Sequence, residues 1–184
     1  MRKSREEAAQ TRKRIVTAAS GEFRKNGIVA TGLNNLMSAA GLTHGGFYKH
    51  FESKDQLVAE ACAEAVKTIL ERLAAAASEK GGAAAAYLST GHRDNPATGC
   101  PLSAVGSELA RSDEKTRAAA TAGFLKLVEI MAGQFGKTPP ASARRRALVA
   151  VSTMIGALTM SRIVTDPELS AEILKEAEMN LAVG

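Results

Sequence analysis

A short segment near the middle of the chain holds the side chains that a nucleophilic enzyme would need. Cys100 lies between Gly99 and Pro101, and His92 and Asp94 precede it by a few residues. Because proline suits the first turn of a helix, we expect the Cys100 thiol at a helix N-terminus, where the partial positive charge lowers a thiol pKa. A Cys–His–Asp set would support nucleophilic catalysis. No motif for an oxyanion hole or a substrate accompanies it, so we assign no catalytic residue, metal or cofactor.

Two other roles for Cys100 stay open. The thiol is either a sensor of electrophiles or oxidants, or a structural cap of the helix that follows. Cys62 falls on an apolar helical stripe and is expected to be inert core. The two cysteines lack the spacing of a zinc or redox motif, and the N-terminus lacks the apolar stretch of a secretory signal. Unpaired cysteines fit a reducing compartment, so we expect a cytoplasmic protein.

A second group of polar side chains, between residues 43 and 51, suits contact with a polyanion. Phe47 and Phe51 lie four residues apart, which predicts a short helix that faces the core on that side. Thr43 suits its N-cap. Gly45 and Gly46 each lower helix stability by about 1 kcal/mol relative to alanine, which is typical of close backbone approach to a ligand such as a DNA phosphate. A plain surface turn is the alternative. The polar residues left facing outward are His44, Tyr48, Lys49 and His50.

The elements around this group form a helix-turn-helix pattern. Apolar residues at i, i+3, i+4 and i+7 predict a helix over residues 33–40, Gly41 can end it in the left-handed conformation, and Thr43 begins the next. Two helices joined by such a turn are typical of DNA-binding domains. A first helix is expected from about Ser4 to Asn26, and Ser53 is the expected N-cap of a long helix.

The positive charge of the chain lies in this N-terminal part. Residues 1–54 hold ten lysines and arginines against four acids, whereas the remaining 130 residues hold fourteen against fifteen. A basic module on a near-neutral body is typical of nucleic-acid binding. Arg2, Lys3 and Arg5 are equally compatible with a solvated tail. Arg12, Lys13 and Arg14 are better placed for phosphates.

These features resemble the TetR family of bacterial transcriptional regulators over about the first 57 residues. One departure is the segment 34–37, where the family more often has an Ile-Ala pair. The resemblance implies a DNA-binding domain at 1–53, an effector-binding and dimerisation domain at 54–184, and a double-stranded DNA operator as partner. The matching residues are Thr11, Ile15, Ala18, Ala19, Phe23, Gly27, Thr31, Leu36, Ala40, Gly41, Leu42, Thr43, Phe47, Tyr48, Lys49, His50, Phe51, Lys54 and Leu57. The DNA-binding residues it implies are Thr31, Thr43, His44, Gly45, Phe47, Tyr48, Lys49, His50 and Lys54.

The remainder of the chain also reads as helical. Alanine is abundant, aromatic residues make up 4% of the chain, and no stretch alternates like a strand. We expect an all-α protein of about nine helices: a three-helix N-terminal unit, then helices near 54–78, 83–90, 101–111, 113–135, 141–163 and 167–181, with a loop at 92–99. The implied effector is small and partly apolar. Its candidate contacts, each equally compatible with plain core, are Val66, Leu70, Leu88, Cys100, Leu102, Phe124, Leu127, Val128 and Met131.

The last two helices are the expected interface of a homodimer, because a single helix-turn-helix makes few base contacts and two-fold pairing is the usual remedy. A core role within a monomer is the alternative. The fifteen uncharged positions between Arg146 and Arg162 are fewer than the roughly twenty that a membrane span needs, so no membrane partner is expected. The candidate interface residues are Val151, Ile155, Leu158, Arg162, Leu174 and Leu181.

Three functions remain to be separated. The favoured one is a dimeric regulator, a repressor released from DNA by a small ligand or an electrophile. The second is a structural DNA-binding protein without an effector, although residues 55–184 are far more than dimerisation requires. The least favoured is a cysteine-dependent enzyme.

Overall fold

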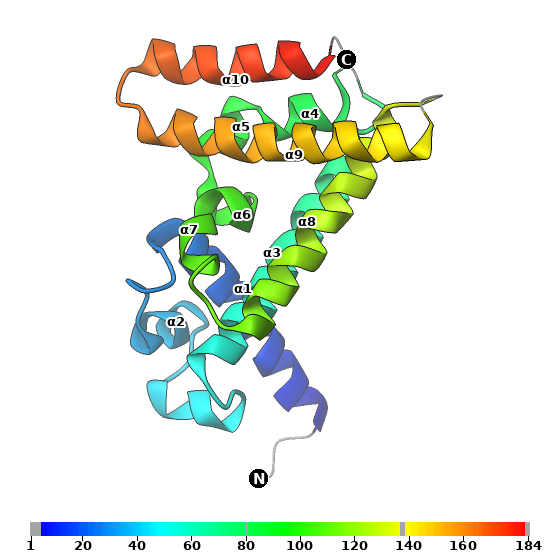
Figure 1. Cartoon of the computed structure of the whole chain (residues 1–184). Coiled ribbons are helices and arrows are strands. Elements are labelled where there is room, and N and C mark those ends of the chain that lie inside the picture. The colour runs from blue at the N-terminus through cyan, green and yellow to red at the C-terminus, as the bar shows by residue number, and fades with distance from the viewer. Residues whose placement is uncertain (1–4, 80, 137–138, 183–184) are drawn as a thin grey trace.

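The computed structural model describes residues 5–79, 81–136 and 139–182, and the regular structure in these ranges is entirely helical. Figure 1 shows a small cluster of short helices near the N-terminus, a diagonal pair of long helices, and two further helices side by side at the opposite end. This confirms the expected all-α fold, with an N-terminal helix-turn-helix unit and a larger helical body. The helices are α1 (Arg5–Asn26), α2 (Leu33–Ala39), η1 (His44–Lys49), α3 (Lys54–Ala76), α4 (Gly82–Tyr87), α5 (Thr90–Asp94), η2 (Pro96–Thr98), α6 (Pro101–Ala104), α7 (Gly106–Leu109), α8 (Glu114–Gln134), α9 (Pro140–Ile163) and α10 (Pro167–Ala182), where η marks a 3-10 helix.

The head, residues 5–53, closes around its own apolar core. Ile15 of α1, Leu36 of α2 and Phe47 of η1 have no exposed surface and meet there. Gly27 and Gly41 adopt positive φ angles of 89° and 67°, which lets the chain turn sharply after α1 and after α2. The head core continues into the body through Leu57 and other residues at the start of α3. The short helices of the head are therefore fixed to a long rigid one.

The body, residues 54–182, is built on the parallel packing of α3 against α8, which Figure 1 shows as the diagonal pair. Gly123 of α8 allows their close approach, because a Cβ atom there would lie 2.6 Å from a methyl group of Val66 on α3. Leu73, Leu127 and Val128 belong to the main core of the body. The body core and the head core are thus separate clusters that share α3 as their common support.

Helices α9 and α10 form a hairpin that lies across one end of the long pair. Ala147, Met154 and Leu158 of α9 have no exposed surface and pack into the body core. By length and composition alone, α9 is the one helix of the described ranges apolar enough to cross a membrane. This helix packs against α8 and α10, and a third of its most apolar stretch (33%) is buried inside the protein.

Several expected boundaries need correction. The predicted loop at 92–99 contains α5 and η2, and the single helix predicted at 101–111 is two short helices that break at Val105. The breaks at Gly81 and Gly82 are confirmed, with φ angles of 83° and 62°. Ser53 caps α3 as expected, since its side chain accepts a hydrogen bond from the Gln56 N–H. The expected start of the first helix at Ser4, and the residues Arg2 and Lys3, lie outside the described ranges.

Candidate nucleic-acid interface and effector region

The exposed surface of the head is centred on η1, which has the predicted two-faced character. Phe47 is fully buried, and its ring packs on Phe51 with 5.6 Å between ring centroids. On the other side His44, Gly45 and Lys49 are exposed, and Tyr48 keeps 68% of its surface. Gly45 and the outward polar side chains therefore lie on the exposed part of η1, whereas Gly46 is half-buried beside Met37 of α2. Phe47 holds that face in place and has no surface of its own for DNA.

The predicted capping of this helix differs in detail. Thr43 is the residue before η1, as expected, but its side chain makes no capping hydrogen bond. The element is a 3-10 helix and not an α-helix, which fits the low helix propensity of Gly45 and Gly46. The Thr43 hydroxyl is thus exposed and uncommitted to the cap.

Two of the residues implied for phosphate binding are committed inside the protein. Thr31 is 1% exposed, and its hydroxyl donates a hydrogen bond to the Gly27 carbonyl at the end of α1. Lys54 Nζ donates to the Ile28 carbonyl at 2.6 Å. Both side chains therefore stabilise the turn between α1 and α2. His50 is half-buried, and its carbonyl accepts a hydrogen bond from Arg12 Nε.

The basic residues of α1 divide in the same way. The Arg12 guanidinium forms a two-bond ion pair with Glu60 of α3 and lies over the Phe51 ring. The hydrogen bonds that Arg12 donates to Glu60 raise the pKa of Arg12. Arg14 donates to the Ala40 carbonyl at 2.7 Å. Lys13 is exposed and lines a groove with Arg14 and Gly41, so it is the member of this set best placed for a phosphate.

Two contacts join the head to the short helices of the body. The Glu108 carboxylate of α7 accepts hydrogen bonds from the backbone N–H groups of Ile28 (3.0 Å) and Val29 (2.9 Å), in the turn after α1. Arg24 of α1 donates to the Gly99 carbonyl at 2.6 Å. Neither residue stands out in the sequence, because their partners lie 80 and 75 positions away along the chain. We refer to the Glu108 contact as the Glu108 clamp.

The segment around His92 is built inward, unlike η1. His92 is 1% exposed, and its Nδ1 lies 2.7 Å from the Tyr87 carbonyl. Its Nε2 accepts a hydrogen bond from the Cys100 backbone N–H at 2.9 Å. These partners place the proton on Nδ1, and burial lowers the His92 pKa to about 4. The imidazole is therefore a neutral structural link, and it faces the peptide group of Cys100.

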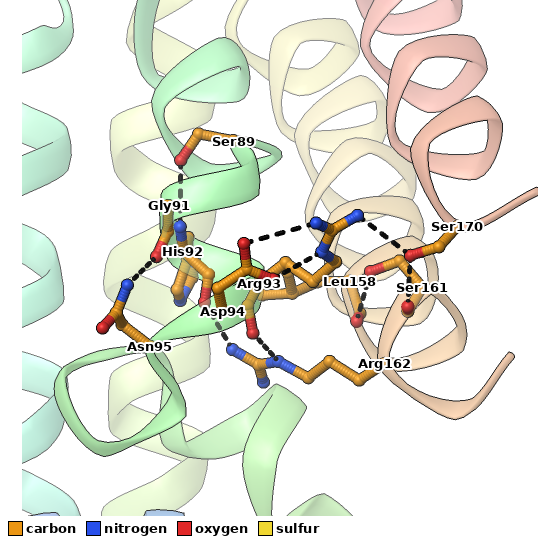
Figure 2. Close-up of polar contacts among 10 residues, drawn as sticks. All are labelled: Ser89, Gly91, His92, Arg93, Asp94, Asn95, Leu158, Ser161, Arg162 and Ser170. Atoms are coloured by element: carbon orange, nitrogen blue, oxygen red, sulfur yellow. Dashed lines mark hydrogen bonds and ion pairs between the residues drawn. The ribbon is translucent and has the colours of Figure 1, made fainter. Parts of the chain in front are cut away.

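Arginine side chains fix this segment by binding its carbonyl groups, as Figure 2 shows. Arg162 of α9 donates to the carbonyls of His92 (2.7 Å) and Arg93 (3.0 Å). Arg93 in turn pairs with Asp94 at 2.7 Å and donates to the Ser170 hydroxyl of α10 at 3.1 Å. The Asp94 carboxylate is thus engaged by its neighbour. Of the three residues considered as a nucleophilic set, His92 binds the peptide N–H of Cys100, and Asp94 pairs with Arg93.

The Cys100 thiol lacks the properties of an activated cysteine. It is 0% exposed, and burial raises its pKa, as burial raises that of Cys62 to about 11. The expected lowering by a helix N-terminus is therefore wrong, because the helix that follows, α6, has only four residues and desolvation dominates. The Cys100 side chain makes no capping hydrogen bond. The part of Cys100 that takes part in this network is its backbone N–H, which donates to His92.

The candidate effector contacts are distributed over different parts of the body. Leu102 and Phe124 line an open groove of about 330 Å³ between α6–α7 and α8–α9. Val66 and Leu70 line another groove, of about 240 Å³, between α3 and α8. The others lie in the main core of the body: Leu88, Cys100, Leu127, Val128 and Met131.

Three of the candidate dimer residues face the protein's own core. Val151, Leu158 and Leu174 are between 0% and 3% exposed, so they have almost no surface left to bury against a partner. Arg162 is committed to α5, and Ile155 and Leu181 are half-buried against the core. The most apolar stripe of α9 faces the body core. The large apolar side chains left exposed on these two helices are Val149, Met160, Ile163, Leu169 and Met179.

Comparison with known proteins identifies relatives for both parts of the chain. A family model described as bacterial regulatory proteins of the tetR family matches residues 15–61, and one described as the C-terminal domain of LmrA/YxaF-like transcriptional regulators matches residues 62–171. The HTH-type transcriptional regulator TtgR of Pseudomonas putida is 41% identical over 58 residues, which are 32% of this chain and 28% of TtgR. The match thus spans about a quarter of that relative's length.

Three likenesses extend over most of the chain. An uncharacterized HTH-type transcriptional regulator of Mycobacterium tuberculosis, MT0206, is 29% identical and is covered over 86% of its length, with 84% of this chain. The crystal structure of a TetR transcriptional regulator from Chloroflexus aurantiacus matches with a TM-score of 0.78 and 25% identity, over 97% of this chain and 95% of that one. Reduced NemR of Escherichia coli has the same fold, with a TM-score of 0.76 and 19% identity over 94% and 95% of the two chains.

Proposed function

The chain belongs to the TetR family of bacterial regulatory proteins, and we propose that it is a transcriptional repressor that binds a double-stranded DNA operator as a homodimer. In this proposal a small, partly apolar ligand releases the protein from its operator. The protein acts in the cytoplasm and carries no catalytic activity. The relatives named above are described as transcriptional regulators.

The observation that carries the proposal is the exposed face of η1. His44, Tyr48 and Lys49 point away from a helix whose opposite side is anchored by Phe47. A recognition helix needs this arrangement, because base contacts require free side chains on a rigid support. In our assignment His44 approaches base edges, Gly45 allows close approach of the backbone, and Tyr48, Lys49 and Thr43 hold phosphates.

The dimer is assigned to the exposed face of α9 and α10. Val149, Met160 and Ile163 are 66%, 48% and 63% exposed, which is unusual for large apolar residues on one helix. Gly156 is exposed on α9 between Val149 and Met160, and its lack of a side chain would let a partner helix approach closely. Half-sites on B-DNA lie about 34–36 Å apart, so only one separation of two heads docks both. A ligand that favours another separation by a few kcal/mol releases most of the protein.

A binding assay on the DNA that flanks the coding region tests the proposal. The chain should bind a specific fragment at moderate salt and lose affinity steeply as salt rises. Lys49→Ala should weaken binding to all sequences and reduce the salt slope by about one. Lys115→Ala, which removes an exposed lysine at the start of α8, is the matched control and should bind normally.

Two outcomes would count against the proposal. Equal affinity of Lys49→Ala and wild type would remove η1 from the interface. Specific DNA binding that no small molecule alters would favour the alternative, a structural DNA-binding protein without an effector.

A further inference from the structure

We propose that the groove between α6–α7 and α8–α9 binds a small organic carboxylate with an apolar body, and that α7 transmits its occupancy to the head through the Glu108 clamp. This inference rests on the proposed function, since it names the ligand class and the route of regulation. Its first half concerns ligand binding alone and is measurable without DNA.

The groove has the composition of a site for an amphipathic molecule. Leu102, Leu109, Phe124 and Ile155 form apolar walls contributed by four different helices. The volume of about 330 Å³ lies at the lower end of the range for small-molecule sites. A compact body of one ring or a short chain fits this space, whereas a large multi-ring ligand does not.

Arg117 gives the groove its charge preference. Its side chain lines the groove and is exposed, and it forms no ion pair within the part of the chain that the structure describes. Asp113, four residues earlier, has its carboxylate engaged in capping α8 through the Thr116 N–H at 2.9 Å. A guanidinium can bind a carboxylate through two parallel hydrogen bonds. The apolar walls with a cation at the edge therefore favour an organic acid over its neutral analogue.

Helix α7 contacts both the groove and the head through two adjacent residues. Leu109 lines the groove, and Glu108, its neighbour, holds the backbone N–H groups of Ile28 and Val29. The helix has four residues and follows the break at Val105, so it can shift as a unit. A shift of about 1 Å takes both hydrogen bonds of the clamp, now 3.0 and 2.9 Å, out of range. A ligand pressing on Leu109 thereby frees the turn that positions α2 and η1.

Ligand binding is tested with 4-phenylbutyrate and its neutral amide, which share the same apolar body. Titration calorimetry on the full chain should show that the acid binds about tenfold or more tightly than the amide. Arg117→Gln should abolish this difference, and Lys115→Gln, which removes a nearby charge on the same helix, should preserve it. No binding of the acid, equal binding of acid and amide, or discrimination that survives Arg117→Gln would overturn the site.

Transmission is tested by Glu108→Gln, with Glu129→Gln on the exposed side of α8 as the control. In wild type and the control, the acid should lower operator affinity at least tenfold. In Glu108→Gln the acid should bind as before and change operator affinity by less than threefold. Glu108→Asp, which withdraws the carboxylate by one methylene, should behave like Glu108→Gln and provides a second variant if the first unfolds. A full response in a folded Glu108 variant would overturn the route through α7.

The two proposals fail in different ways. If the unliganded chain binds no DNA, the proposed function fails, while the comparison of acid with amide still decides the groove. If the chain binds its operator and the groove takes no acid, the site fails and the DNA-binding assignment stands.

Discussion

Residues 43–50 and 92–100 contain similar kinds of side chains in opposite surroundings. Each segment holds histidine, glycine and a basic residue on short helices, and each suggests a chemical function in the sequence. In the first, His44 and Lys49 point into solvent from a helix anchored on one side. In the second, His92 is buried and both of its ring nitrogens are engaged by backbone groups.

The difference teaches that residue type does not separate a binding surface from a structural link. What separates them is the element that carries the side chain and what covers it. Residues 43–50 lie on the outside of a small three-helix head. Residues 92–100 lie between α3, α9 and α1, where Arg162 and Arg24 bind their carbonyl groups. The polar groups of residues 43–50 are therefore free to bind a partner, whereas those of residues 92–100 bind other groups within the protein.

The largest expected effect contrasts two positions on α9 near the second segment. Leu158→Glu places a charge in a site with no exposed surface and should lower the free energy of unfolding by at least about 4 kcal/mol, so that the chain fails to fold. Met160→Glu alters a side chain that is 48% exposed and should leave a folded protein that no longer dimerises. Thermal unfolding and light scattering distinguish the two results. A stable Leu158→Glu monomer would place that residue at the dimer interface after all.

The next effect concerns the pH dependence of stability. Because the folded His92 pKa is about 4 and its ordinary value is 6.5, the unfolded chain binds a proton more readily. The free energy of unfolding therefore keeps the full contribution of neutral His92 above pH 6.5. It falls by roughly 3 kcal/mol in total as the pH drops to about 4. His92→Gln should be less stable at neutral pH and should flatten this part of the stability curve. Denaturant unfolding between pH 4 and 7 measures both.

His44→Gln is the matched control for that measurement. His44 is exposed, so its replacement should leave the free energy of unfolding at neutral pH nearly unchanged and lower DNA affinity. If both histidine variants showed the same unfolding curve at every pH, the contrast between the two segments would be lost.

The smallest effect separates two lysines of the head. Lys54 donates to the Ile28 carbonyl and lies 5.9 Å from the centre of the Phe23 ring. Lys54→Ala should lower stability by about 1 kcal/mol and change the salt dependence of DNA binding little. Lys49→Ala should leave stability nearly unchanged and reduce the salt dependence of DNA binding. Thermal melts and salt titrations of both variants check this, and an equally reduced salt slope would return Lys54 to the phosphate contacts.

The sequence was sufficient for features encoded locally. The spacing of Phe47 and Phe51, the turn at Gly41 and the cap at Ser53 each depend on neighbours within a few positions, and the structure confirms these elements. The exposure of His44 and Lys49 followed from the same helical periodicity.

Features that depend on long-range packing were beyond the sequence. The apolar stripe of α9 contains Val151 and Leu158, but periodicity does not say whether such a stripe faces the body or a second chain. The resemblance implied DNA contacts for Lys54 and Thr31, but in the folded chain both side chains bind carbonyl groups of the turn between α1 and α2. Glu108 has no distinguishing local pattern, since its partners come from the head.

The Glu108 clamp has a consequence for hydrogen exchange. The Val29 side chain is 83% exposed, yet its backbone N–H donates to the carboxylate at 2.9 Å. An amide in so open a loop ordinarily exchanges with solvent deuterium almost at the rate of a free peptide, because nothing but a persistent hydrogen bond protects it. Protection of this amide is thus a measure of how long α7 remains docked on the turn. Its exchange rate records, in solution and at a single atom, how often the Glu108 clamp opens.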